Sequence, residues 1–244
     1  MAIKRRFGWL HEFPDYRDIS YKGVTIKLPK SVDLTENCSP VENQGSLGSC
    51  TANALAGVLE YNEKKDSTFI DMSRLFIYYN ERALEGTVNS DSGAMIRDGI
   101  KTLAKLGVCD EKLWPYVISK FAEKPSKKCY KEALERRIIS YATMDTLQEI
   151  KTCLADGFPI AFGFTVYESF MSEKVAKTGI ASLPEPGEGC CGGHAVVCVG
   201  YDDATQMIKV RNSWGKEWGL NGYFYLPYVY TEKSLSDDYW TVRK

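Results

Sequence analysis

The sequence predicts an α+β fold in two lobes, because the spacing of its apolar residues changes part-way along the chain. From residue 49 to about residue 157, apolar side chains recur every three to four positions, as they do on one face of a helix. Beyond that point, short stretches of β-branched and aromatic residues alternate with Gly, Asp and Asn, which is typical of strands joined by turns. The length of 244 residues suits one large domain or two small lobes around a shared cleft.

Five helices are expected in this first part of the chain. Ser49 stands where an N-cap residue would precede the first helix. Ser73 and Gly86 bracket the second helix, since Gly readily adopts the left-handed conformation at which helices end. The expected ranges are 49–64, 73–85, 94–106, 130–138 and 146–156.

Four strands are expected after residue 157, over 159–166, 194–201, 206–211 and 222–227. The turn at residues 202–205 joins two of them as a hairpin. In front of the helices, residues 28–48 are rich in Pro, Gly, Asn and Ser and are expected to form a loop. The chain therefore divides into a short N-terminal segment, 1–27, a mainly helical lobe, 28–140, and a β-rich lobe, 141–244.

The overall composition excludes several classes of protein. The 31 Lys and Arg residues are balanced by 32 Asp and Glu residues, so we expect no nucleic-acid partner and no anionic membrane surface. No apolar run approaches the roughly 18 residues of a membrane-spanning helix. The basic cluster Lys4, Arg5 and Arg6 is not followed by the apolar run of a secretory signal. A cytoplasmic location with reduced thiols is the default expectation, with export or a lytic compartment left open.

Cys50 is the candidate nucleophile among eight cysteines. It lies at the predicted start of the first helix, where unpaired N–H groups and a partial positive charge lower the pKa of a thiol. Gly45 and Gly48 in the preceding loop allow backbone N–H groups to approach a reacting carbonyl. Cys50 also fits as a small buried apolar residue, as most free cysteines are.

Only two histidines are available as a catalytic base, His11 and His194. His194 opens one predicted strand, and Asn212 ends the next strand 18 residues later. Adjacent antiparallel strands would hold the amide beside the imidazole, where its carbonyl orients the ring. A structural histidine on a sheet and an ordinary turn residue are the alternatives, but they do not explain the order Cys, His, Asn.

Three segments give a specific resemblance to a known family. The segments ENQGSLGSCTA, GGHAVVCVGYDD and RNSWGKEWGLNGYFYLP resemble the cysteine, histidine and asparagine blocks of the papain-like cysteine peptidases. The 144 residues from Cys50 to His194 also match the family spacing of about 130–150 residues. The resemblance covers residues 28–228 and implies a papain-like fold, in which a helical N-terminal lobe and a β-barrel-like C-terminal lobe enclose an active-site cleft.

The resemblance also implies a role for each matching residue in a cysteine endopeptidase. Cys50 matches the nucleophile, His194 the general base and acid, and Asn212 the amide that orients the ring. Gln44 matches the side chain of the oxyanion hole. The substrate-binding candidates are Trp214, which shields the Asn–His hydrogen bond, Gly93, which pairs with an extended substrate, and Gly193 before the histidine. No cofactor and no metal are implied.

Two departures from the family pattern concern disulfides and substrate preference. Leu47 stands where the family often has a disulfide cysteine, and Thr51 replaces the aromatic residue after the nucleophile. The expected partners are a polypeptide substrate and proteinaceous inhibitors of cysteine proteases, and the protein is expected to be a monomer. Residues 1–27 either lie over the cleft as an inhibitory, pro-like segment or pack elsewhere on the body.

Three other functions stay open from the sequence. The thioester formed at Cys50 would pass to an amine in a transamidase or ligase. A non-catalytic relative would act as a binding module, although it would be expected to lack the cysteine. Finally, Cys190, Cys191, Cys198 and His194 would form a zinc site, although two adjacent cysteines suit one tetrahedral ion poorly.

Overall fold

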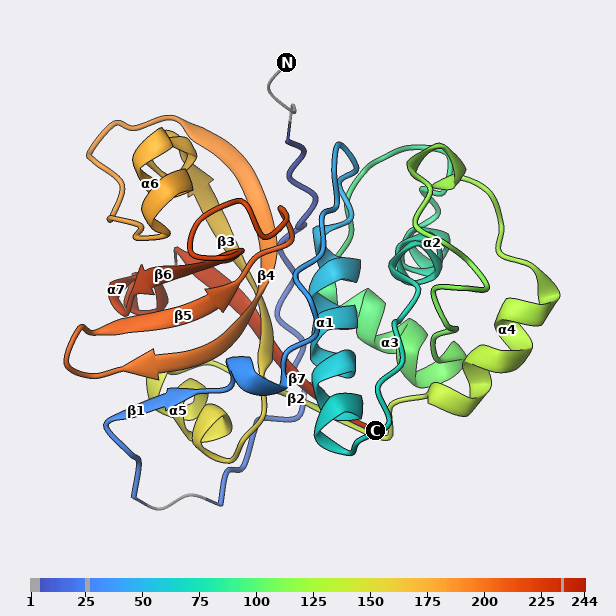
Figure 1. Cartoon of the computed structure of the whole chain (residues 1–244), viewed down its shortest axis with the longest axis horizontal. Coiled ribbons are helices and arrows are strands. Elements are labelled where there is room, and N and C mark those ends of the chain that lie inside the picture. Colours follow the sequence, from blue (N-terminus) through green and yellow to red (C-terminus); the bar gives the residue numbers. More distant parts are fainter. Residues whose placement is uncertain (1–4, 25–26, 234) are drawn as a thin grey trace.

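The computed structural model describes residues 5–24, 27–233 and 235–244 of the chain. A helical half and a sheet half lie on either side of one central helix, α1 (Cys50–Lys65) (Figure 1). The predicted α+β class is confirmed. Residues 1–4 and 25–26 of the predicted segment 1–27 lie outside the described residues.

Helix α1 is buried from Cys50 to Glu63 because both halves pack against it. Its sequence of small and apolar residues on several faces suits such a position. The other helices of this half are α2 (Arg74–Glu85), α3 (Ile96–Leu106) and α4 (Lys127–Ala133), with 3₁₀ turns at Ile118–Lys120 and Leu134–Arg136.

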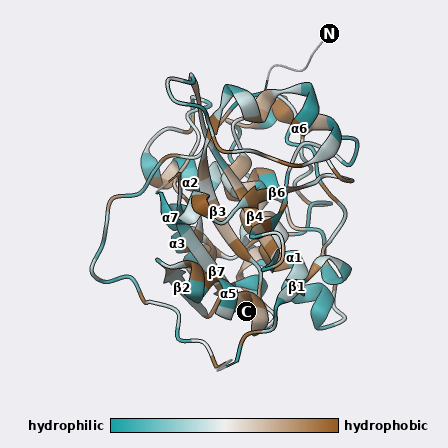
Figure 2. Cartoon of the chain, turned by 90° about the vertical axis from the view of Figure 1, so that its left-hand side faces the viewer, coloured by the Kyte–Doolittle hydropathy of each residue, from teal (hydrophilic) through white to brown (hydrophobic). Residues whose placement is uncertain are grey.

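Among the described residues, the sheet half contains seven strands, all paired antiparallel. They are β1 (Ser31–Asp33), β2 (Ser140–Met144), β3 (Ile160–Tyr167), β4 (Cys190–Asp202), β5 (Met207–Arg211), β6 (Tyr223–Pro227) and β7 (Ser236–Arg243). Their order is β2-β7-β3-β4-β5-β6, with β1 on β4. Helices α5 (Leu147–Ala155), α6 (Glu173–Thr178) and α7 (Val229–Glu232) accompany the sheet, as do 3₁₀ turns at Thr35–Asn37 and Glu168–Met171. The central strands are strongly apolar (Figure 2).

The element boundaries agree with the sequence except in a few places. The helix expected over 130–138 begins earlier, because the Ser126 side chain accepts a hydrogen bond from the Cys129 N–H and caps the helix there. Ser49 precedes α1, but its hydroxyl does not cap the helix and contacts the Tyr116 hydroxyl instead. The loop expected over 28–48 includes strand β1. Four further elements were not expected: β2, α6, α7 and β7.

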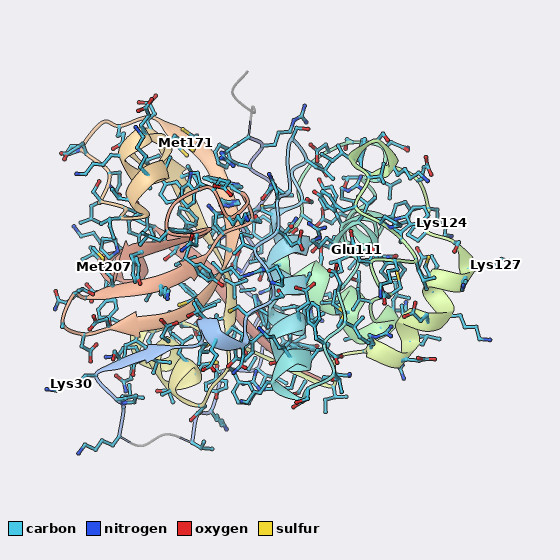
Figure 3. All side chains as sticks on the ribbon, in the orientation of Figure 1. Lys30, Glu111, Lys124, Lys127, Met171 and Met207 are labelled. Carbon is cyan, nitrogen blue, oxygen red and sulfur yellow. The ribbon has the colours of Figure 1, made fainter. Side chains whose placement is uncertain are left out.

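A buried polar bridge joins the two halves beneath the site. The Arg211 guanidinium, at the end of β5, donates to Ser39 Oγ over 3.0 Å and to the Pro40 carbonyl. Ser39 in turn donates to the Glu60 carboxylate on α1. Gly57 leaves the room for this contact, because a Cβ there would lie 2.5 Å from the Arg211 guanidinium. Side chains fill the space between the halves (Figure 3).

The N-terminal segment runs between the two halves before it crosses the outside of the body (Figures 1 and 2). Trp9 forms a parallel bridge to Ala94, and Ser20 forms one to Thr143. All eight cysteines are free thiols. Among the described residues, no helix has the length and apolar character needed to cross a membrane.

Candidate active site

The fold brings the predicted cysteine, histidine and asparagine to the seam between the halves. Cys50 is the first residue of α1, His194 lies in β4, and Asn212 directly follows β5. Strands β4 and β5 are antiparallel neighbours, so the imidazole and the amide come together across the sheet. All three side chains are almost completely buried.

The imidazole of His194 is oriented by Asn212. His194 Nε2 lies 2.8 Å from Asn212 Oδ1, and because an amide oxygen accepts, Nε2 carries the proton. Nδ1 of the neutral ring then carries a lone pair, and it has no hydrogen-bond partner among the described residues. The indole of Trp214 stacks on the ring, with centroids 4.7 Å apart and an interplanar angle of 21°. The indole therefore covers one face of the imidazole, and its role in shielding the Asn–His hydrogen bond from water stays a prediction.

Gln44 is held with its amide nitrogen toward the cleft. Ser213 Oγ donates to Gln44 Oε1 over 2.6 Å, which fixes the orientation of the amide. Gln44 Nε2 donates to the Leu47 carbonyl over 2.9 Å and to the Arg6 carbonyl, in the N-terminal segment, over 3.4 Å. The side chain predicted for the oxyanion hole therefore already contacts a peptide carbonyl.

Burial determines the electrostatics of the two candidate reacting groups. Desolvation raises the pKa of the Cys50 thiol to about 11, although backbone N–H groups of Ala195, Gly8 and Thr51 lower it. Desolvation also lowers the pKa of His194 to about 4, against the hydrogen bond to Asn212. In this conformation the two groups are therefore a neutral thiol and a neutral imidazole.

Residues 6–10 cause this burial by crossing directly over the site. The Phe7 ring packs edge-on against His194, with centroids 6.2 Å apart. The Trp9 N–H donates to the Gly193 carbonyl over 3.0 Å. Gly8 passes so close to Gly48 that a Cβ on Gly8 would lie 1.8 Å from the Gly48 carbonyl oxygen.

Both glycines predicted to bind substrate, Gly93 and Gly193, contact this segment. Gly93 has φ +78° and packs against Gly8, where a Cβ would lie 2.2 Å from the Gly8 carbonyl oxygen. The backbone hydrogen bonds to the segment at this point are made by the next residue, Ala94. The Ala94 N–H donates to the Gly8 carbonyl over 2.8 Å, and the Leu10 N–H donates to the Ala94 carbonyl over 3.0 Å.

Three residues of this site were not singled out from the sequence. Ser213, which orients Gln44, lies within the asparagine motif. Gly163 on β3 and Asp238 on β7 both contact Trp9. The glycine between two phenylalanines marks a close approach and was a usable signal for Gly163, whereas Asp238 has none, because the strand that carries it was not expected.

The four residues considered as zinc ligands do not form a cluster. Of the described residues, three metal-ligating side chains come within 4.8 Å of one another only at His11, Asp237 and Asp238. The Cys198 thiol is buried and contacts the Gly200 carbonyl. Cys190 and Cys191 are exposed at the start of β4.

Comparison with known proteins decides the family. Residues 28–239 match the family model described as papain family cysteine protease. The chain belongs to the papain family. It is therefore a papain-like thiol protease, and thus a hydrolase.

Individual relatives agree with this membership. The chain is 44% identical to the uncharacterized peptidase C1-like protein L477 of Acanthamoeba polyphaga mimivirus, over 100% of this chain and 88% of that protein. It is 27% identical to pro-cathepsin H of Mus musculus, over 91% of this chain and 67% of that protein. The crystal structure of xylellain, a cysteine protease from Xylella fastidiosa, matches with a TM-score of 0.93 and 42% identity, covering 100% of this chain and 99% of xylellain.

Proposed function

We propose that this papain-family protease hydrolyses peptide bonds of polypeptides through Cys50, His194, Asn212 and Gln44. The observation that carries the proposal is the hydrogen bond of 2.8 Å between His194 Nε2 and Asn212 Oδ1, which leaves Nδ1 as the proton acceptor. Cys50 at the helix start supplies the thiol, and Gln44 supplies an N–H donor.

The reaction proceeds in two stages. His194 Nδ1 takes the Cys50 proton, and the sulfur attacks the carbonyl carbon of the peptide bond. The resulting oxyanion accepts hydrogen bonds from Gln44 Nε2 and the Cys50 N–H. His194 then gives the proton to the leaving amine as the C–N bond breaks, which leaves a thioester. Water, deprotonated by His194, hydrolyses the thioester and restores the thiol.

Residues 5–12 are proposed to hold the protease inactive. They cover Cys50 and His194, and the Arg6 carbonyl contacts Gln44 Nε2. Burial by this segment favours the neutral thiol over the thiolate that must attack. The N-terminal segment is also anchored beyond the site, since Arg97 Nη2 forms ion pairs with Glu12 and, further along the segment, with Asp18.

An irreversible epoxide of the cysteine-protease type tests the nucleophile. The reduced protein is treated with the reagent, and the adduct is located by peptide mass mapping. We expect the adduct on Cys50, no hydrolysis by Cys50→Ala, and a turnover reduced about 10²–10³-fold by Gln44→Ala. An adduct on another cysteine, or hydrolysis by Cys50→Ala at the parent rate, contradicts the proposal. Product analysis with an added amine separates hydrolysis from transfer.

A further inference from the structure

The peptide unit that joins Leu47 to Gly48 is held from both sides, shortly before Cys50 in the chain. Its carbonyl accepts a hydrogen bond from Gln44 Nε2 over 2.9 Å. Its N–H donates to both oxygens of the Asp91 carboxylate, over 2.9 Å to Oδ1 and 3.2 Å to Oδ2. Because a peptide unit is planar and rigid, the direction of its N–H fixes the direction of its carbonyl. The contact with Asp91 therefore determines how the Leu47 carbonyl faces the amide of Gln44.

The Asp91 carboxylate is itself fixed by the fold. The hydroxyl of Tyr78, a buried residue of α2, donates to Asp91 Oδ1 over 2.6 Å and accepts from the Gly93 N–H over 3.1 Å. The Asp91 side chain is 11% exposed and also pairs with Arg6 Nη1 of the N-terminal segment, 3.1 Å from Oδ2. When the segment leaves the cleft, Asp91 loses Arg6 and keeps Tyr78 and Gly48. Its hold on the peptide unit therefore persists in the open site.

No disulfide connects the loop that precedes the nucleophile to the loop that contains Asp91. All eight cysteines are free thiols, and Leu47 stands where the family often has a disulfide cysteine. The first loop contains Gly48 and also Gly45, which has φ +63°, so its backbone has little intrinsic stiffness. A hydrogen bond from an N–H to a carboxylate is charge-assisted and roughly twice as strong as a neutral one. Asp91 therefore ties together two loops by a contact between residues 43 positions apart in the sequence.

We propose that Asp91 is a positioning residue for the oxyanion hole and acts on Gln44 through the peptide unit between Leu47 and Gly48. The proposal rests on the proposed peptide hydrolysis and adds a residue to its machinery. Gln44 Nε2 carries two N–H bonds, and when one donates to the Leu47 carbonyl, the other is directed into the cleft. In the covered site, Nε2 also meets the Arg6 carbonyl there. The charge of Asp91 polarises the peptide unit and strengthens the first bond, which keeps the second N–H directed at a substrate carbonyl.

A double-mutant cycle between Asp91 and Gln44 tests this role. The 244-residue chain carries Trp9→Ala throughout, so that the segment is released and the ion pair with Arg6 does not affect the result. The kcat/KM value for one fluorogenic peptide is measured with Asp91→Ala, with Gln44→Ala and with both. We expect Asp91→Ala alone to lower kcat/KM about 10–100-fold, because the oxyanion donor loses its direction. In the presence of Gln44→Ala it should lower kcat/KM less than about threefold, since Asp91 acts through Gln44.

Two further variants and a second reaction separate this role from a merely structural one. Asp91→Asn keeps an acceptor for the Gly48 N–H and should retain kcat/KM within about threefold. Glu85→Ala is the matched control, because the Glu85 carboxylate accepts from the Met95 N–H over 2.9 Å and holds the same second loop without touching the first; kcat/KM should stay within about twofold. Iodoacetamide alkylates the Cys50 sulfur by displacing iodide and forms no oxyanion, so its rate should not fall in Asp91→Ala.

The possible failures are distinguishable. An unchanged kcat/KM in Asp91→Ala, an equal loss in Asp91→Asn, a loss that is additive with Gln44→Ala, or a fall in the alkylation rate overturns the positioning role and leaves the proposed function intact. If Asp91→Ala does not fold, Tyr78→Phe takes its place in the cycle. It removes the hydroxyl that orients Asp91 and should lower kcat/KM at least about threefold, but only while Gln44 is present; an absent or additive effect overturns the inference. If Gln44→Ala itself leaves kcat/KM unchanged, the proposed role of Gln44 fails and this inference fails with it.

Discussion

Replacing Trp9 by Ala in the 244-residue chain should release the segment from the site. The indole is 8% exposed, lies against Gly163 and Gly193, and donates to Asp238. Truncation of a buried aromatic side chain costs about 3–5 kcal/mol. Because about 1.36 kcal/mol corresponds to a factor of ten, the lower limit predicts that the open fraction of the site rises by about 100-fold.

Alkylation of the Cys50 thiol measures this opening directly. The thiol is fully buried, so it reacts with iodoacetamide only when the segment has left. If opening and closing are faster than alkylation, the observed rate follows the open fraction. We therefore expect Cys50 in Trp9→Ala to react about 100-fold faster than in the parent protein, with a matching rise in peptide hydrolysis.

Phe13 supplies the matched control, since it lies in the same segment but is 81% exposed. Phe13→Ala should react at nearly the parent rate. The urea dependence of the rate separates local release from global unfolding, because only unfolding exposes a large surface and gives a steep dependence. An unchanged alkylation rate in Trp9→Ala would refute the reasoning, and so would a steep urea dependence.

Four further substitutions test other contacts. Burial raises the pKa of Glu12 from 4.5 to about 7, so the contribution of Glu12 to segment docking is largest below pH 4.5 and is lost as the pH rises through 7. The alkylation rate of the parent relative to Glu12→Gln should therefore rise across this range, and a flat ratio contradicts this. Asn212→Ala should lower kcat about 100-fold with little change in KM, because the His194 ring loses its orientation; an unchanged kcat in steady-state assays argues against that role. Gln44→Ala should retain slow turnover without a fall in the Cys50 alkylation rate, because the substitution also removes a contact to the segment; a large rise in that rate with a steep urea dependence would indicate misfolding instead. Arg211→Met should lower the free energy of unfolding by about 1–3 kcal/mol in urea titrations, whereas Lys216→Met, at an exposed position, should change it little. Equal effects would show that the buried bridge contributes no more to stability than an exposed side chain does.

The elements that were predicted well carry local signals. The Ser73 hydroxyl caps α2, and Gly86 ends it in the left-handed conformation, so both ends of the helix are determined by residues adjacent to it in the sequence. Strand β7 has no such signal, because the acidic pair Asp237 and Asp238 is typical of a loop. In the structure a bulge between β3 and β7 brings Asp238 against the Trp9 indole. Its position depends on pairing with β2 and β3, far away in sequence.

The catalytic candidates were predictable because their motifs are dense and their order is fixed. The path of the N-terminal segment was left undecided, since its aromatic residues have no periodicity that points to a partner. The structure supplies what was missing: the donors of Trp9 and Glu12 match an acceptor on a strand more than 220 residues away.

The pKa of Cys50 shows why the position of the segment matters for chemistry. A helix N-terminus stabilises a negative charge by about 0.3–1 kcal/mol at exposed sites and up to about 2 kcal/mol in partly buried ones. That contribution alone does not offset complete desolvation, and the pKa of Cys50 in the covered site accordingly lies at about 11. The same burial lowers the pKa of His194 to about 4, so each group loses the charge that would stabilise the other. Activation therefore requires water to re-enter the cleft, and the side chains that exclude it, Phe7 and Trp9, are the residues whose removal should restore the ion pair.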